Sequence, residues 1–121
     1  MKKIFTLLSC VLLTTSLMAA GGDSGSSMNG SSKVSLYKDA VKLIKRAGKF
    51  EKKEKIEKAN KLYTQAFKKL EKALSTDKNN PDILNYMGYT SRKIGKFEQA
   101  EKFYLKGLSI KPDHNGINEY L

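Results

Sequence analysis

The sequence of 121 residues contains few of the residues that usually build catalytic and metal centres. It has no tryptophan, one cysteine, one histidine and two prolines. A zinc site of histidine and cysteine ligands cannot be assembled from so few, and a single thiol excludes an intrachain disulfide. His114 stands alone in a predicted loop, where we expect it to be solvated. The composition therefore excludes a zinc site built from histidine and cysteine and an intrachain disulfide framework.

Signals of other enzyme classes are also missing. No glycine-rich phosphate loop follows a predicted strand, and the helical serines Ser75, Ser91 and Ser109 have no plausible base partner. The carboxylates Glu54 and Glu57 alternate with lysines, a pattern typical of a solvated helix surface. We therefore expect no catalytic residues, no cofactor and no enzyme activity.

Residues 1–20 have the pattern of a secretory signal peptide. Lys2 and Lys3 precede a mostly apolar run that ends at Leu17, and small residues follow it. Polar residues interrupt this run, which is shorter than the roughly 20 apolar residues that span a bilayer. We predict export with cleavage near residue 20, most simply to a periplasm, with a membrane anchor formed by residues 4–20 as the alternative. Cleavage would also remove Cys10, the only thiol.

The remaining chain is strongly basic. The formal net charge is +11 for the whole sequence, and loss of Lys2 and Lys3 would leave +9. Nearly all of the cations are lysines, with only Arg46 and Arg92, and lysine lacks the planar fork that binds phosphate and bases in a bidentate way. We therefore expect a generally basic surface and no nucleic-acid partner.

Helical periodicity begins after a glycine- and serine-rich stretch, residues 21–33, which predicts a disordered linker. A first helix is predicted by an apolar stripe, and Gly48-Lys49-Phe50 is expected to end it. A long second helix should follow from about Glu51 to Ser75. The stripe consists of Tyr37, Ala40, Val41, Ile44 and Ala47.

Two further helices are predicted in the C-terminal part of the chain. Asn80 is a suitable N-cap with Pro81 at the first helical position, which begins a helix that runs to Ile94. After Gly95-Lys96, a fourth helix should extend from Phe97 to about Ile110, with Asp113 or Asn115 capping the next one. The shift that superimposes Ala66 on Ala100 also places Leu74 on Leu108, and therefore indicates an internal repeat.

Small and large residues alternate along residues 84–112 as they do in a tightly packed helix pair. In this arrangement residues 81–114 resemble a tetratricopeptide repeat, whose helix-turn-helix unit has a period of about 34 residues. The shift found above is this same period. The positions that match the family's packing residues are Gly88, Ala100, Tyr104, Gly107 and Pro112.

This resemblance implies an all-α fold in which antiparallel hairpins stack into a short right-handed solenoid. Residues 34–80 would form a degenerate hairpin with an extended second helix, in which about thirteen extra residues follow Gly48-Lys49-Phe50. Residues 81–114 would form the best repeat, and residues 115–121 the truncated start of another. Ile117, Tyr120 and Leu121 would then leave an apolar edge through which the protein could self-associate.

The resemblance also implies a function, because the first helices of such repeats line a groove that generally receives peptides or partner helices. The chain is thus expected to be an interaction scaffold or adaptor for a protein or peptide partner. The matching groove positions are Asp82, Asn85, Tyr89, Arg92 and Lys93. The alternative is a basic helical protein that binds anionic envelope components, a lipid surface or an acidic polymer, through Lys42 to Lys61.

Overall fold

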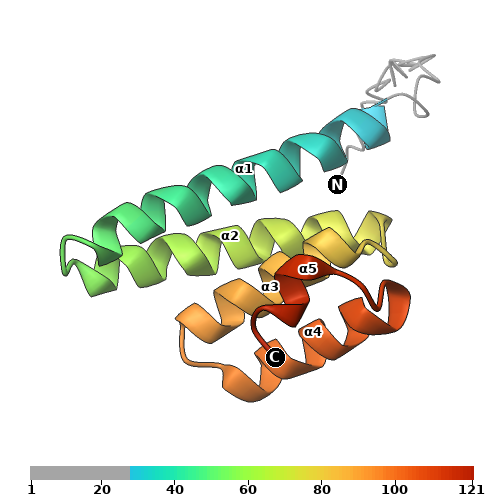
Figure 1. Ribbon diagram of the computed structural model, residues 1–121. Coiled ribbons are helices and arrows are strands. Elements are labelled where there is room, and N and C mark those ends of the chain that lie inside the picture. The colour runs from blue at the N-terminus through green and yellow to red at the C-terminus, as the bar shows by residue number, and fades with distance from the viewer. Residues whose placement is uncertain (1–27) are drawn as a thin grey trace, which may run out of the picture.

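The computed structural model describes residues 28–121, which form five helices and no strands (Figure 1). The predicted signal peptide and most of the predicted linker lie outside these residues. The helices pack as antiparallel neighbours in chain order, α1 against α2, α2 against α3, and α3 against α4. This arrangement confirms the predicted all-α solenoid of stacked hairpins. The helices are α1 Met28–Glu51, α2 Ile56–Thr76, α3 Pro81–Lys93, α4 Phe97–Ile110 and α5 Asn115–Asn118.

Helix α1 is longer at both ends than the sequence pattern predicts. It begins at Met28, inside the segment predicted as a disordered linker. Lys33 in this added part forms a 3.1 Å ion pair with Asp77 at the far end of α2, which gives these turns a tertiary partner. At its other end α1 continues through Gly48 to Glu51, because Phe50 packs against the core and a glycine inside a helix costs only about 1 kcal/mol.

The turn between α1 and α2 is consequently formed by residues 52–55 and not by Gly48-Lys49-Phe50. The amide of Lys55 donates to the carbonyl of Phe50, and the amide of Glu54 donates to that of Glu51. This pair of hydrogen bonds is a Schellman motif, whose left-handed position is normally glycine. Here it is Glu54, with φ of 58°. The α3–α4 turn has the same two bonds, with Gly95 in the left-handed position at φ of 82°.

The equivalence of the two turns corrects the predicted spacing of the repeats. Glu54 and Gly95 hold the left-handed position in the two turns. They lie farther apart in the sequence than Asn80 and His114, the N-cap residues of α3 and α5. The difference lies within α2, which has 21 residues where α4 has 14. The added length is almost two complete helical turns, so it extends the hairpin without rotating its apolar face. The expected insertion of about thirteen residues was therefore wrong, because it counted from the wrong turn.

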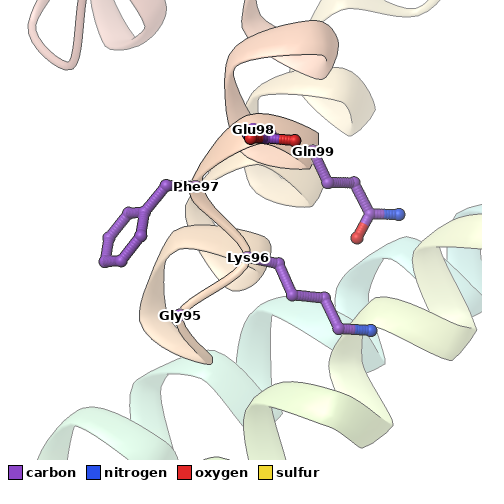
Figure 2. A pocket seen from close by; sticks show the side chains of 5 residues that line it. All are labelled: Gly95, Lys96, Phe97, Glu98 and Gln99. Carbon is purple, nitrogen blue, oxygen red and sulfur yellow. The ribbon is translucent and has the colours of Figure 1, made fainter.

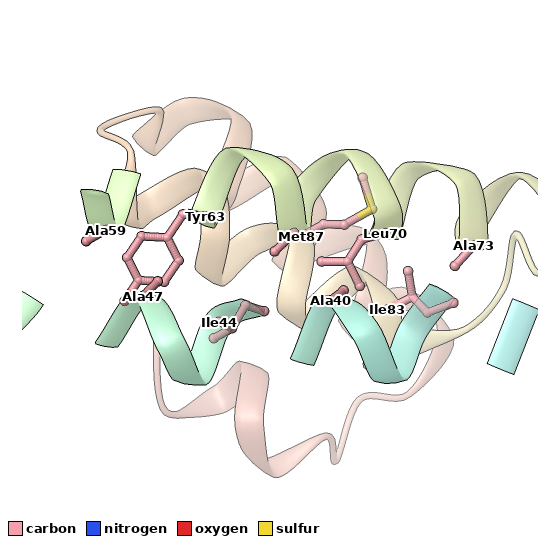
Figure 3. Close-up of a cluster of buried hydrophobic side chains, with 10 residues drawn as sticks. Ala40, Ile44, Ala47, Ala59, Tyr63, Leu70, Ala73, Ile83 and Met87 are labelled. Carbon is pink, nitrogen blue, oxygen red and sulfur yellow. The ribbon is translucent and has the colours of Figure 1, made fainter. Parts of the chain in front are cut away.

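The main core lies between the first three helices (Figure 3). Alanines at regular intervals on α2 alternate with Tyr63 and Leu70, and all of these side chains are buried. Small residues at each helix crossing allow the backbones to approach, and the large ones fill the space beside them. The buried residues of this cluster are Ala40, Ile44, Ala47, Ala59, Tyr63, Ala66, Leu70, Ala73, Ile83 and Met87.

A smaller cluster joins α3, α4 and α5. Gly88 faces the ring of Tyr104, and a Cβ atom at position 88 would lie 2.6 Å from Cδ1 and 2.7 Å from Cζ. Gly107 is similarly covered by Ile117. Ala100 is also buried in this cluster, so four of the five predicted packing positions are at helix contacts. Pro112 is exposed, and its carbonyl accepts a hydrogen bond from Asn118.

The predicted apolar edge is smaller than expected, because Ile117 is fully buried against Gly107 of α4 while Tyr120 and Leu121 stay exposed. In the described part of the chain, every helix is too short or too polar to cross a membrane. Within residues 28–121, histidine, cysteine and carboxylate side chains do not gather in groups of three that could hold a metal ion.

Candidate functional site

The predicted groove residues all lie on α3, whose beginning is fixed by a well-formed cap. The Asn80 side chain accepts hydrogen bonds from the amides of Asp82 at 3.0 Å and Ile83 at 3.2 Å, which confirms the predicted N-cap. Asn80 also donates to Asp77 at 3.0 Å. This hydrogen bond and the ion pair with Lys33 lower the pKa of Asp77. The start of α3 is thereby tied to both α1 and α2.

Asp82 and Asn85 contact α5. His114 Nε2 lies 2.9 Å from Asp82 Oδ1, while His114 Nδ1 accepts a 3.2 Å hydrogen bond from the amide of Ile117. Because Nδ1 accepts, Nε2 carries the hydrogen and donates to Asp82. Asn85 lies against Gly116, and its Oδ1 atom is buried. These two side chains therefore hold the segment that begins the next helix, although the Asp82 side chain stays exposed.

His114 differs from its predicted role. It is only 8% exposed and caps α5, whereas the sequence led us to expect a solvated histidine with Asp113 or Asn115 as the cap. The partner that buries it, Asp82, is 32 residues away, so local sequence does not reveal it. The internal repeat does contain the signal, because it places His114 on the N-cap Asn80.

The other three groove residues meet in one pocket. Tyr89, Arg92 and Lys93 line a cavity of about 490 Å³ together with Glu51, Phe97 and Tyr120. Phe97 is 65% exposed and Tyr120 is 38% exposed, so the cavity has open aromatic walls as well as cations. We call these six residues the α3 pocket. Sequence reasoning missed Glu51, Phe97 and Tyr120 as site residues because they come from the ends of two other helices and from the segment after α5.

Glu51 connects three helices beneath this pocket. It accepts hydrogen bonds from Lys93 Nζ at 3.0 and 3.1 Å and from the Tyr63 hydroxyl at 2.9 Å. Burial is the largest influence on Lys93 and disfavours its ammonium form, but the hydrogen bond to Glu51 and the nearby charges of Glu51 and the tyrosines together raise the pKa of Lys93. Burial, followed by the hydrogen bond to Glu51, raises the pKa of Tyr63. Lys93 is thus held as a cation in a fixed place.

Four tyrosines form a continuous aromatic row along the pocket. The ring centroids of Tyr63 and Tyr89 are 6.1 Å apart, those of Tyr89 and Tyr120 are 5.7 Å apart, and Tyr120 stacks on Tyr104 at 5.7 Å. Arg92 lies 5.6 Å from the centroid of Tyr120, and Lys93 lies 5.5 Å from that of Tyr89. Such cation–π contacts each contribute about 0.5–1 kcal/mol at exposed sites.

The charge balance of the pocket favours an anionic or hydrogen-bond-accepting group. Within residues 28–121, Arg92 forms no ion pair, whereas Lys93 is already paired with Glu51. The guanidinium of Arg92 therefore offers donors in a planar fork, the geometry that matches a carboxylate. The aromatic walls would pack against the apolar parts of the same ligand.

A second hollow of about 520 Å³ lies at the α3–α4 turn (Figure 2). It is lined by residues 95–99, and the ring of Phe97 points to the opposite side from Lys96 and Gln99. Its side chains diverge, so they do not converge on a common ligand. Phe97 lines both this hollow and the α3 pocket. It is therefore the only residue of this hollow that we include in the candidate binding site.

Comparison with known proteins identifies the repeat. Residues 69–102 match the family model described as "Tetratricopeptide repeat". The matched segment begins within α2 and ends within α4, so it has the length of one predicted repeat in a different phase. No curated protein and no solved structure matches the chain.

Proposed function

We propose that the chain, whose residues 69–102 match the tetratricopeptide repeat family, binds a peptide segment of a partner protein in the α3 pocket. Repeats of this family are generally non-catalytic scaffolds for protein–protein interaction. The observation that supports this site is the convergence of Tyr89, Arg92 and Lys93 with Phe97 and Tyr120 around one cavity. In this proposal Arg92 donates hydrogen bonds to an acceptor group of the peptide, either a carbonyl or the terminal carboxylate.

Arg92 and Lys93 have different roles because their surroundings differ. Glu51 holds Lys93 beside Tyr89, so Lys93 contributes a fixed positive field. Arg92 is exposed and free of ion pairs within the described residues, so it can reorient toward a ligand. Tyr89 and Phe97 supply flat apolar contact, the component of binding that salt does not screen.

A panel of short peptides with free C-terminal carboxylates, and the same sequences amidated, tests this function. We expect selected peptides to lose affinity on Arg92→Ala and on Tyr89→Ala. Arg46→Ala is the matched control, because it removes the only other arginine of the sequence, which does not line the α3 pocket. Binding that disappears at moderate salt and survives Tyr89→Ala would contradict the proposal.

We further propose that the protein is exported and acts in a periplasm or cell envelope, on the basis of the signal-like residues 1–20. Mass spectrometry of the mature N-terminus, from protein expressed with a C-terminal tag, tests this. Cleavage near residue 20 is expected. An intact N-terminus in a membrane fraction would instead support the anchor alternative.

A further inference from the structure

The turn end of the α1–α2 hairpin presents a second surface, whose lining residues differ from those of the α3 pocket. Arg46, Lys49 and Lys53 surround a hollow of about 270 Å³ together with Phe50. All three cations are exposed, and none of the four lining residues is acidic. The hollow therefore combines concentrated positive charge with an aromatic side.

Charge near this hollow is only partly balanced. Lys58 lies 6.0 Å from the centroid of the Phe50 ring, and Lys52 and Lys55 lie in and beside the turn. Residues 46–58 contain six cations and three glutamates. One of these glutamates, Glu51, is bound by Lys93 and Tyr63 on the other side of the hairpin. The turn end is therefore a locally cationic tip.

An exposed aliphatic side chain distinguishes this surface from a simple basic patch. Ile56, the first residue of α2, is 51% exposed directly after the turn. A single exposed apolar residue is ordinary, but here it stands between Lys53 and Lys58 in the sequence. Lysine stems can lie along an apolar surface while their charged ends reach outward to phosphate. A soluble polyanion would engage the cations but would leave Ile56 in water.

We propose that this end of the hairpin docks on an anionic lipid bilayer. Arg46, Lys49 and Lys53 contact lipid phosphates, and Ile56 enters the headgroup region. Basic helical surfaces with apolar side chains bind membranes in this way, through charge attraction and buried apolar area together. The inference goes beyond the proposed peptide binding. The hollow and the α3 pocket share no lining residue, so both can be occupied at once.

The absence of tryptophan makes a site-specific test of the full chain practical. Ile56→Trp reports the hairpin end, and Leu105→Trp on α4, at a residue that is 53% exposed, is the matched control. With vesicles of phosphatidylcholine and phosphatidylglycerol, we expect a blue shift of emission from position 56 and none from position 105. Vesicles of phosphatidylcholine alone should give no shift at either position. Because emission is local, attachment through another part of the chain does not imitate this result.

A second experiment removes the positive charges that surround the hollow. Replacing Arg46, Lys49 and Lys53 by glutamine in the Ile56→Trp chain should raise the half-saturating lipid concentration by on the order of a hundredfold, since each cation contributes about fivefold. The matched control replaces three exposed lysines elsewhere, Lys68, Lys72 and Lys102, and should leave the titration unchanged.

Three results would overturn the proposal. One is an equal shift at positions 56 and 105, and another is no shift at position 56. The third is tighter binding of polyphosphate than of anionic vesicles with position 56 still in water, which would make the surface a polyanion site.

Discussion

Gly88→Ala tests the packing of α3 against α4 within the second hairpin. The added Cβ atom would lie 2.6 and 2.7 Å from two atoms of the Tyr104 ring, closer than carbon atoms approach without displacement. Small-to-large changes in a well-packed core cost typically about 1–3 kcal/mol. Alanine also gains about 1 kcal/mol of helix propensity over glycine, so we expect a net destabilisation of up to about 2 kcal/mol.

Gly48→Ala is a control with the same chemistry and no obstruction. Gly48 is also inside a helix, and its nearest neighbour atom beyond the helix is the Tyr63 hydroxyl oxygen at 4.0 Å. We expect this substitution to stabilise the protein by about 0.5–1 kcal/mol. Urea denaturation measures both changes, with the slope of the unfolding free energy unchanged.

A double mutant separates the contact from backbone effects. Tyr104→Leu removes the ring that obstructs position 88, so Gly88→Ala should cost less in that background, with a coupling energy of about 1 kcal/mol or more. If Gly88→Ala proved as stabilising as Gly48→Ala, the close approach of α3 and α4 at Gly88 would be refuted.

The remaining predictions concern the turns, the tyrosines and the α5 cap. Glu54→Gly should stabilise the protein to urea by about 1 kcal/mol, since a non-glycine residue in the left-handed region costs about that much, while Gly95→Ala should destabilise it similarly; a destabilising Glu54→Gly would contradict the Schellman geometry. Burial raises the pKa values of Tyr37 and Tyr104 to about 12, above the value of 10.0 expected when unfolded. The folded state resists deprotonation, so stability should be complete below pH 10 and should fall as pH rises from 10 to 12. Phenolate absorbance and circular dichroism would measure this, and tyrosines that all titrate near 10 without unfolding would exclude it. His114→Ala should lower the unfolding free energy by about 1–2 kcal/mol through loss of the α5 cap, and His114→Asn should restore much of it in thermal denaturation; equal stability of all three proteins would contradict the cap.

Local sequence was sufficient for the second hairpin. The cap at Asn80, proline at the first position of α3 and glycine in the α3–α4 turn are short-range signals with a direct physical cause, and the observed helices begin where these signals place them. The end of α1 was predicted wrongly because its stop motif has no such signal. Glu54 occupies a glycine position, and Gly48 is tolerated inside the helix because Phe50 beyond it gains core contacts.

The candidate site was predictable only in part. Tyr89, Arg92 and Lys93 are neighbours along one helix, so the repeat phase alone places them together. Glu51 and Tyr120 join them only through tertiary packing of α1 and of the segment after α5. Helical periodicity describes one helix at a time, so it does not identify the side chains that other elements contribute to the site.

The account rests most directly on where a bound peptide lies. Amide chemical-shift mapping of the isotope-labelled protein during titration with a selected peptide would locate it. We predict that the shifts cluster in residues 89–97 and at Tyr120. Shifts confined to residues 42–61 would contradict peptide binding in the α3 pocket.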